Sequence, residues 1–441
     1  MLKLLLILIQ LLQLCFGDEL LAVQIMWRHG ARNPYFCNWG CNDKIKQSLS
    51  ELTPVGMRQH YVLGQWLKKQ YIDTGFLEPY FNENQIYIES SNTNRTIMSA
   101  YSNLQGMYPL GPIVPEISSD LLLPPMIDVK TPDGISNYAL PNRIQVIPIH
   151  SIQEELDYVM YMYCPKFWDN GAHNLHTDVY YDINNRSQEL INQFNIQLKQ
   201  NLTNIVELYE WRDTFISNIY NGGDNPQNLT KDMMEQLDKI AGLGFLLKYT
   251  QDYYQASLLT SEFFKNVLNG FDDILNGTSK IKYHAYSAHD SSIYASLYAL
   301  NLTNVECYNQ SYFGKIESNN TCITTYPDYT ANLIYELYNS STLGPYVKIM
   351  YNGTYVNICQ DKALTCQYSH FKSILKGIQK DYIKECQIYD PSKPIDYQTP
   401  WWAILFFVLV LGCCICSISM IVIIHQKKQR FITLNDDQYR V

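Results

Sequence analysis

A predicted strand near the N-terminus ends in a cluster of positive charge. Residues 20–26 are almost entirely apolar, which is typical of a buried strand, and the sequence RHGARNP (residues 28–34) follows at once. Two guanidinium groups beside His29 would both need partners away from water. A phosphate satisfies them, because the arginines hold its oxygens through forked hydrogen bonds while the imidazole faces phosphorus as a nucleophile. Gly30 would let the backbone approach that anion closely.

Two further segments place charged residues at the end of a predicted strand. Residues 85–88 lead through a polar cluster into a helical pattern that begins near Arg95. Residues 281–287 lead in the same way to His289 and Asp290. In a parallel α/β sheet the carboxyl ends of the strands share one edge, so these side chains would converge there. The pattern predicts an α/β fold with a mostly parallel central sheet flanked by helices.

The middle of the chain differs from its flanks. Residues 132–270 contain aromatic helical patterns and few strand-like runs, and we interpret them as an inserted, mainly helical cap domain. Such a cap walls off one side of a pocket and sets substrate choice. Residues 18–131 and 271–390 then form the α/β core. A helix is expected from Pro54, a first-turn proline that follows a capping threonine.

The chain carries an apolar segment at each end. Residues 1–17 combine one lysine, a leucine-rich stretch and small residues, which is typical of a cleaved signal peptide; a buried helix or a signal anchor is the alternative. Residues 401–424 contain no charge and are followed by basic residues, which predicts a transmembrane helix. Residues 391–400 form a short proline-rich stalk before it, and residues 425–441 a cytoplasmic tail.

These segments predict a single-pass type I membrane protein whose bulk is luminal or extracellular, in a lysosome, a food vacuole or at the cell surface. The chain has 12 cysteines, and removing the four in the two apolar segments leaves an even set, which suggests disulfides in an oxidising compartment. Glycosylation sequons accumulate between the two ends, as in a glycoprotein. The net charge of −9 argues against nucleic-acid binding, so an anion site must be a local concentration of positive residues.

Four motifs together resemble the histidine acid phosphatases, and in particular the branch that contains the prostatic and lysosomal enzymes. They are RHGARNP (28–34), LTPVGMRQ (52–59), NRT with MSA (94–100) and YSAHD (286–290). Each alone arises by chance, but four in the family's order form a specific signal. The resemblance implies a three-layer α/β/α core with a cap, and hydrolysis of small-molecule or peptide phosphate monoesters. It implies no cofactor and no metal, and a homodimer is expected only on this likeness.

The resemblance also implies roles for single residues. His29 would attack phosphorus and form a phosphohistidine, and Asp290 would protonate the leaving group and then activate water. The residues expected to hold the phosphate oxygens are Arg28, Arg32, Arg95 and His289. Acid working conditions follow, because the arginines keep His29 unprotonated in mild acid while Asp290 must carry a proton when the leaving group departs.

The cysteine pairing is expected from the same likeness, since sequence alone leaves the connectivity open. Relatives join a cap cysteine to one beyond the histidine-aspartate motif, and the cap here offers only Cys164. The expected pairs are Cys164 with Cys386, Cys359 with Cys366, Cys37 with Cys41, and Cys307 with Cys322.

Other interpretations stay open at this point. His173 and His176 lie three apart near Asp178, but a full set of metal ligands is missing, so a polar cap loop is preferred. The alternative functions are an inositol-polyphosphate phosphatase of the same superfamily and a non-catalytic, receptor-like ectodomain. The acidic composition and the pair His289-Asp290 argue against the first. Loss of a phosphate-site residue would favour the second, and none is lost.

Overall fold

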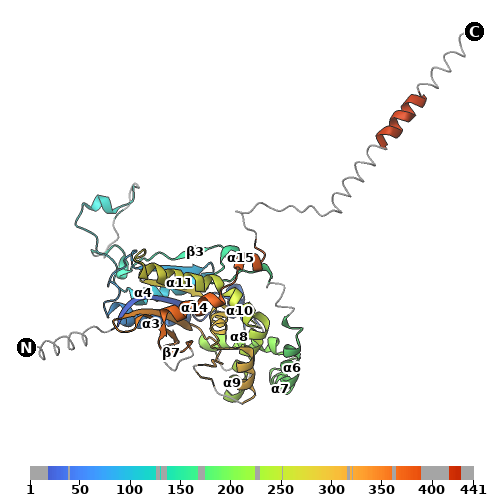
Figure 1. The fold of residues 1–441 in the computed structure, drawn as a ribbon, viewed down its shortest axis with the longest axis horizontal. Helices are drawn as coiled ribbons and strands as arrows, with labels where there is room; N and C mark the ends of the chain where they lie inside the picture. The colour runs from blue at the N-terminus through green and yellow to red at the C-terminus, as the bar shows by residue number, and fades with distance from the viewer. Residues whose placement is uncertain are drawn as a thin grey trace, which may run out of the picture. The chain divides into compact units, whose positions relative to one another are not determined.

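The computed structural model describes residues 18–37, 40–125, 130, 137–166, 174–223, 229–250, 252–314, 318–319, 321–359, 364–388 and 417–428. The chain divides into two compact units, Met1–Ile388 and Tyr389–Val441. Figure 1 shows the mixed α/β fold of the first unit, which contains every strand of the described chain.

An eight-stranded sheet forms the centre of the first unit. Its order is β3-β2-β4-β1-β5-β6-β7, and β8 pairs with β6. The strands are β1 (Glu19–Arg28), β2 (Ile86–Ser91), β3 (His150–Ile152), β4 (Tyr283–Ala288), β5 (Asn332–Ser340), β6 (Gly344–Tyr351), β7 (Thr354–Val356) and β8 (Cys366–Gln367).

The sheet is mixed, so the predicted mostly parallel sheet is wrong for half of it. β1, β2, β3 and β4 run parallel to one another, as the three strand exits require. β5 lies antiparallel to β1, and β6, β7 and β8 continue in antiparallel pairs. Residues 341–343 and 352–353 are short turns, which can join antiparallel neighbours, whereas parallel neighbours need a crossover of about a dozen residues or more.

Helices cover both faces of the sheet. Successive residues of β1 point to opposite faces and therefore enter two different cores. Val23, Ile25 and Trp27 pack with residues of α3 and α4. Ala22 and Met26 belong to a larger core that includes α11 and the helices of the predicted cap. The helices are α2 (Asp43–Gln47), α3 (Pro54–Leu67), α4 (Asn94–Met107), α6 (Asp178–Arg186), α7 (Gln188–Leu198), α8 (Ile205–Tyr220), α9 (Lys231–Tyr249), α10 (Tyr253–Leu259), α11 (Ser261–Leu275), α12 (Asp290–Ala299), α13 (Val305–Tyr312), α14 (Tyr368–Ile378) and α15 (Tyr382–Glu385).

The helix predicted after the first motif is α3. The Thr53 hydroxyl accepts a hydrogen bond from the Gly56 amide, and Pro54 stands in the first turn. The predicted cap region contains α6 to α10, and α11 crosses the boundary predicted at residue 270 to contact β1 and α14. Because one continuous core joins these helices to the sheet, the exact limits of a cap domain stay a prediction.

The second unit is described only at residues 417–428, which are helical. The predicted signal peptide, the stalk and residues 401–416 of the predicted span lie outside the described residues. Within the part of the chain that the structure describes, no helix is long and apolar enough to cross a bilayer.

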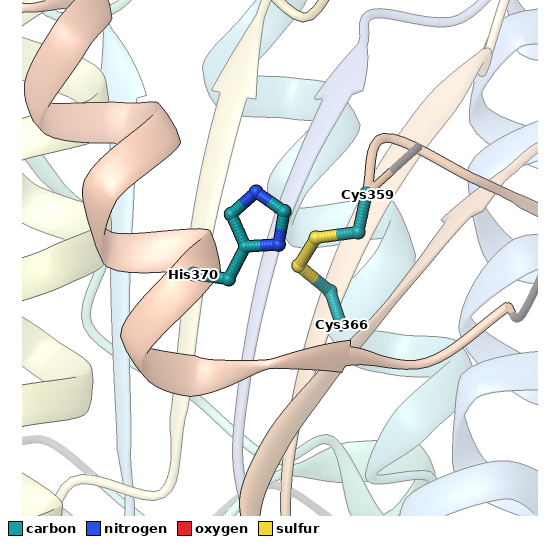
Figure 2. Close-up of side chains that lie close together, drawn as sticks. All are labelled: Cys359, Cys366 and His370. Atoms are coloured by element: carbon teal, nitrogen blue, oxygen red, sulfur yellow. A yellow bond between two sulfur atoms is a disulfide. The ribbon is translucent and has the colours of Figure 1, made fainter. Parts of the chain in front are cut away.

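Four disulfides join the eight cysteines among the described residues of the first unit. They are Cys37–Cys41, Cys164–Cys386, Cys307–Cys322 and Cys359–Cys366. These are the pairs expected from the family resemblance. Cys164–Cys386 closes the longest loop, tying the chain before α6 to the end of α15, and Cys359–Cys366 lies beside His370 of α14 (Figure 2).

Candidate active site

The three predicted strand exits meet at one edge of the sheet. β1 and β4 are neighbours in parallel register, with Arg28 opposite Ala288, so the residues that follow each strand emerge side by side. The rings of His29 and His289 lie 5.8 Å apart, centroid to centroid. β2 flanks β4 on its other side and leads into α4, which carries Arg95 in its first turn. The candidate residues therefore converge, as predicted from parallel strand geometry.

His29 is held in one tautomer. Its Nδ1 lies 2.9 Å from the Gly30 carbonyl oxygen, which only accepts hydrogen bonds, so Nδ1 carries the proton and Nε2 keeps its lone pair. The ring is 2% exposed and borders a cavity near the sheet edge. Burial, and then Arg95, Arg28 and the other cations around the ring, lowers the pKa of His29 well below 6.5. The unprotonated imidazole is the form that acts as a nucleophile.

Gly30 is required for packing against α3; its predicted role of giving an anion close access to the backbone stays a prediction. A Cβ at Gly30 would stand 2.3 Å from the Gly56 carbonyl oxygen, a separation that neither backbone tolerates. Two hydrogen bonds also fix this loop. The Gly30 amide donates to Ser99 Oγ at 3.0 Å, and the Ala31 amide donates to Gln59 Oε1 at 2.8 Å. These contacts hold His29 against α3 and α4.

Arg28 lies behind the cavity rather than in its wall. Its guanidinium donates to the Pro327 carbonyl at 2.8 Å, forms an ion pair with Asp290 at 3.0 Å and packs over the ring of Tyr329 at 4.4 Å. The side chain is 2% exposed. In this arrangement Arg28 acts on the cavity through Asp290, which does line it.

Arg32 is anchored by Asp213 of α8, a residue that no sequence motif indicates. The two side chains form a double hydrogen bond, with nitrogen-oxygen distances of 2.7 and 3.3 Å, and both are almost fully buried. Asp213 also accepts a hydrogen bond from the Tyr35 amide at 2.7 Å. A helix from the predicted cap thereby fixes both an arginine and the loop that follows the first motif. Nothing short of the folded structure shows this pairing, because the two residues lie 181 positions apart.

Arg95 and His289 form a connected polar network. Arg95 donates to Ser50 Oγ at 2.9 Å and approaches His289 Nδ1 at 3.4 Å, and His289 Nε2 lies 2.8 Å from Ser91 Oγ. An arginine only donates, so Nδ1 accepts and Nε2 carries the proton. Burial and then Arg95 lower the pKa of His289 to about 3, and burial and then Arg32 lower the pKa of Arg95 to about 10. His289 is therefore neutral and orients Arg95.

Asp290 is ionised. Burial alone would raise its pKa, but the Arg28 charge, followed by a hydrogen bond of 2.7 Å from the Tyr326 hydroxyl, outweighs burial and lowers the pKa of Asp290 to about 2. Tyr326 is a second residue that carries no motif in the sequence. Arg212 of α8 lies over its ring at 3.9 Å and is paired with Asp238 of α9.

These residues border a cavity of about 470 Å³ between the sheet edge and the helices α8, α9 and α10. Five of the six predicted phosphate-handling residues line it: His29, Arg32, Arg95, His289 and Asp290. The Nε atoms of Arg32 and Arg95, which line the cavity, are buried and have no hydrogen-bond partner among the described residues. Buried donors of this kind call for an acceptor, and an oxyanion supplies several at once.

Other histidines of the chain have surroundings that differ from those of His29. His60 is fully buried and donates from Nε2 to the Arg28 carbonyl at 3.0 Å, while His150 and His370 are exposed. His176 forms a hydrogen bond with the Tyr181 hydroxyl at 2.9 Å, and His173 lies outside the described residues. Among the described residues, the one group arranged closely enough to hold a metal is Cys359, Cys366 and His370. Its two sulfurs are joined to each other, so they offer no thiolates (Figure 2).

Stability should fall in acid because of the buried histidines. Burial lowers the pKa of His60 to about 3, against 6.5 when unfolded. Below pH 6.5 the unfolded chain binds a proton that the folded chain does not, so His60 contributes stability in full above pH 6.5 and loses it as pH falls towards 3. At pH 5 the loss is about 2 kcal/mol.

The substitution His60→Gln tests this account. Urea denaturation at pH 7.5 and at pH 5 measures how far the free energy of unfolding drops between the two, and we expect this drop to be smaller in His60→Gln by about 2 kcal/mol. His370→Gln, at an exposed position, should leave the drop unchanged, and equal drops in all three proteins would contradict this account.

Comparison with known proteins agrees with this geometry. The model of the "Histidine phosphatase superfamily (branch 2)" matches residues 38–352. The chain belongs to this superfamily. The match begins after His29. The lysosomal acid phosphatase of Xenopus laevis is 26% identical over 386 residues, which cover 84% of this chain and 79% of the relative. The prostatic acid phosphatase of Bos taurus is 28% identical over 312 residues, covering 65% and 70%. The protein is thus a phosphoric monoester hydrolase of the histidine acid phosphatase family.

A solved structure supports the fold independently. The phytase of Hafnia alvei in complex with myo-inositol hexakis sulphate superposes with a TM-score of 0.58, at 14% sequence identity, covering 85% of this chain and 99% of that one. At this identity the likeness concerns the α/β architecture alone.

Proposed function

We propose that this protein is a membrane-anchored acid phosphatase that hydrolyses phosphate monoesters through a covalent phosphohistidine, with no metal required. One observation carries the proposal. The free Nε2 of His29 borders a cavity whose wall also contains Arg32, Arg95 and the carboxyl group of Asp290. A nucleophile, a concentration of positive charge and a proton-transfer group are the three components that this reaction needs.

In the first step, His29 Nε2 forms a bond to phosphorus as the bond from phosphorus to the ester oxygen breaks. The electron pair goes to the leaving oxygen, which takes a proton from the Asp290 carboxyl group. Arg32 and Arg95 stabilise the charge that spreads over the equatorial oxygens. Arg28 contributes through its ion pair with Asp290.

Asp290 must gain a proton before this step, although Arg28 and Tyr326 hold it ionised. A bound phosphate brings negative charge next to the carboxylate and competes for the arginines, and both effects raise the pKa of Asp290. Mild acid then completes the protonation. In the second step, the Asp290 carboxylate takes a proton from water, the water oxygen bonds to phosphorus, and the bond to His29 breaks to release phosphate.

The proposed location is the secretory pathway, with attachment to a membrane. Four disulfides favour an oxidising compartment. The relatives include enzymes named lysosomal acid phosphatase. The uncharged stretch 401–424 supports a membrane anchor.

The small number of lysines and arginines that line the cavity favours this proposal over an inositol-polyphosphate phosphatase. Apart from Arg32 and Arg95 at the phosphate end, Lys248 is the one basic residue among the described cavity-lining side chains. A polyphosphorylated ring would place several further charges against aromatic and apolar walls, which is costly. A receptor-like ectodomain has no need of an open His29 Nε2.

The test is hydrolysis of p-nitrophenyl phosphate and of inositol hexakisphosphate by the full-length protein, with chelator present, from pH 4 to pH 8. We expect turnover of the first substrate in mild acid, and at least about tenfold lower kcat/KM for the second, since its extra charges lack partners. A preference for the polyphosphate would replace the proposal by the inositol-directed function. No turnover of either by folded protein would favour a binding role.

A further inference from the structure

One wall of the cavity is a row of aromatic rings that leads away from the phosphate end. Successive ring centroids lie 4.8 to 6.4 Å apart along the series Tyr35, Phe36, Tyr209, Phe245 and Tyr249. All five line the cavity. The row begins near Arg32, whose guanidinium lies 5.9 Å from the Tyr35 ring, and it ends beside Lys248. Such a wall favours a flat apolar group over a hydrated sugar alcohol.

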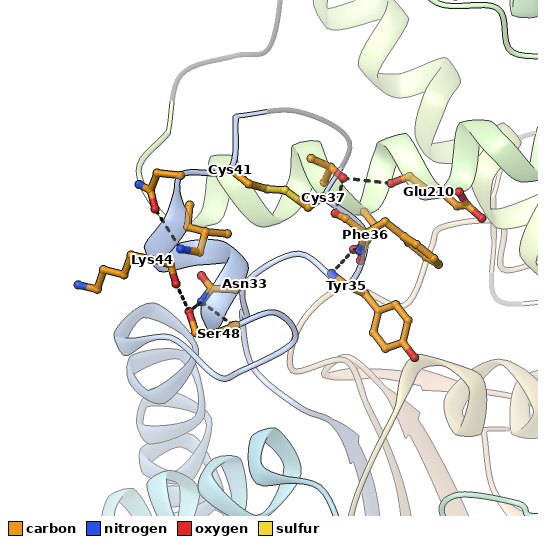
Figure 3. Close-up of a disulfide and its surroundings, with 12 residues drawn as sticks. Asn33, Tyr35, Phe36, Cys37, Cys41, Lys44, Ser48 and Glu210 are labelled. Carbon is orange, nitrogen blue, oxygen red and sulfur yellow. Dashed lines mark hydrogen bonds between the residues drawn. A yellow bond between two sulfur atoms is a disulfide. The ribbon is translucent and has the colours of Figure 1, made fainter.

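The start of this row is fixed to the helix α8. Asp213 accepts hydrogen bonds from the Tyr35 amide at 2.7 Å and, more weakly, from the Phe36 amide at 3.5 Å. Thr214 donates to the Phe36 carbonyl at 2.7 Å. Figure 3 shows both rings on the loop that leads into the disulfide Cys37–Cys41, with α8 alongside. The aromatic wall is therefore preformed, and the same carboxylate that positions it also holds Arg32.

Lys248 stands at the far end of the row. It is half-buried, lines the cavity, and its Nζ lies 5.0 Å from the centre of the Tyr249 ring. Within the described residues, no carboxylate lies within 4.0 Å of the Lys248 ammonium group, which is the limit for an ion pair. Lys248 does act electrostatically on Glu210, where its charge opposes the rise in pKa that burial causes. The side chain of Asn174, which also lines the cavity, donates a hydrogen bond to the Lys248 carbonyl at 3.0 Å. The end of the cavity thus offers an ammonium group without a counter-ion.

We propose that Lys248 forms a second anion subsite, so that the preferred substrate is an aromatic phosphate ester carrying an additional carboxylate on the side of the ring away from the phosphate. The inference rests on the proposed phosphatase function and adds the substrate class. The phosphate occupies the end with Arg32 and Arg95, the ring lies along the aromatic wall, and the carboxylate pairs with Lys248. Met162, Leu259 and Ala295 also line the cavity and add apolar surface for the ring.

Substrates that differ in one charge test this subsite. The full-length protein is assayed with 4-carboxyphenyl phosphate, with its carboxamide analogue, and with the corresponding pair in which a two-carbon spacer separates ring and carboxyl group. For one of the two pairs we expect the carboxylate to have about five- to tenfold lower KM than the amide, as for a hydrogen bond to a charged group. In Lys248→Gln this ratio should fall to about one. Lys239→Gln, an exposed position on the same helix α9, should keep the full ratio.

The outcomes separate this inference from the proposed function. Turnover of all substrates with equal KM for acid and amide, or a ratio that survives in Lys248→Gln, would overturn the subsite and leave the phosphatase intact. Absence of turnover with every aryl phosphate would remove both. Comparing acid with amide within each protein cancels any change in folding or active concentration that a substitution causes.

Discussion

Replacing His29 by alanine is expected to abolish turnover of p-nitrophenyl phosphate, with a loss of about 10⁴-fold or more in kcat, because no other group can form the bond to phosphorus. The ring borders the cavity with a free Nε2, and its proton sits on Nδ1 against Gly30. The substitution leaves Arg32, Arg95 and His289 in the cavity wall, so the phosphate site itself should remain. Product phosphate should still bind to His29→Ala, and isothermal titration with inorganic phosphate measures this.

The control is His370→Ala, which removes an exposed histidine of α14 that does not line the cavity. It should keep wild-type kcat and KM. A covalent intermediate gives a second readout: acid-labile, alkali-stable phosphate should appear on wild-type protein quenched during turnover and be missing from His29→Ala. Residual activity in His29→Ala above about 1% of wild type, in preparations free of other phosphatases, would assign the nucleophile to another residue or to water.

Much of the site could be predicted from strand exits. Arg28, His29, His289 and Asp290 follow two strands that turn out to be adjacent and parallel, and parallel order alone brings their exits together. The antiparallel half of the sheet was harder to predict, because the residues of β5 are buried on both faces and show little alternation. A run of this kind does not reveal the direction of its neighbours.

Asp213 and Tyr326 were not predictable for a different reason. Each acts through one partner that is distant in sequence, Arg32 for the first and Asp290 for the second. Asp213 lies within an aromatic helical stretch, where a single acid is ordinary for a solvated face. Asp213 differs from an acid on a solvated face only in that it is buried and, because a buried charge needs a partner, in its double hydrogen bond. The electrostatic state of Asp290 depends on the same kind of contact, so the sequence indicates the proton donor but not that Arg28 and Tyr326 hold it ionised.

The role of Asp290 leads to the second large effect, which depends on the leaving group. Asp290→Asn keeps the size of the side chain and cannot donate a proton as an acid. For an alkyl ester such as glycerol phosphate, whose leaving oxygen needs a proton, we expect kcat/KM to fall by about 10²- to 10⁴-fold. For p-nitrophenyl phosphate, whose leaving group is stable as an anion, bond cleavage needs no acid and the loss in the first step should be much smaller. A burst of p-nitrophenol followed by slow turnover is then expected, because the hydrolysis of the phosphohistidine still lacks its base.

Comparing the two substrates within one variant also removes the effect of folding. Asn at this position leaves Arg28 buried without its counter-ion, which costs stability whatever Asp290 does in catalysis. That cost lowers the activity on both substrates equally, whereas loss of the acid lowers alkyl hydrolysis more. Tyr326→Phe gives the complementary change: it removes a hydrogen bond to the ionised carboxylate, so the pKa of Asp290 should rise from about 2 and the acid form should persist to higher pH. The pH profile for glycerol phosphate should then extend towards neutrality in Tyr326→Phe, while an unchanged profile, together with equal losses on both substrates in Asp290→Asn, would mean that another group supplies the proton.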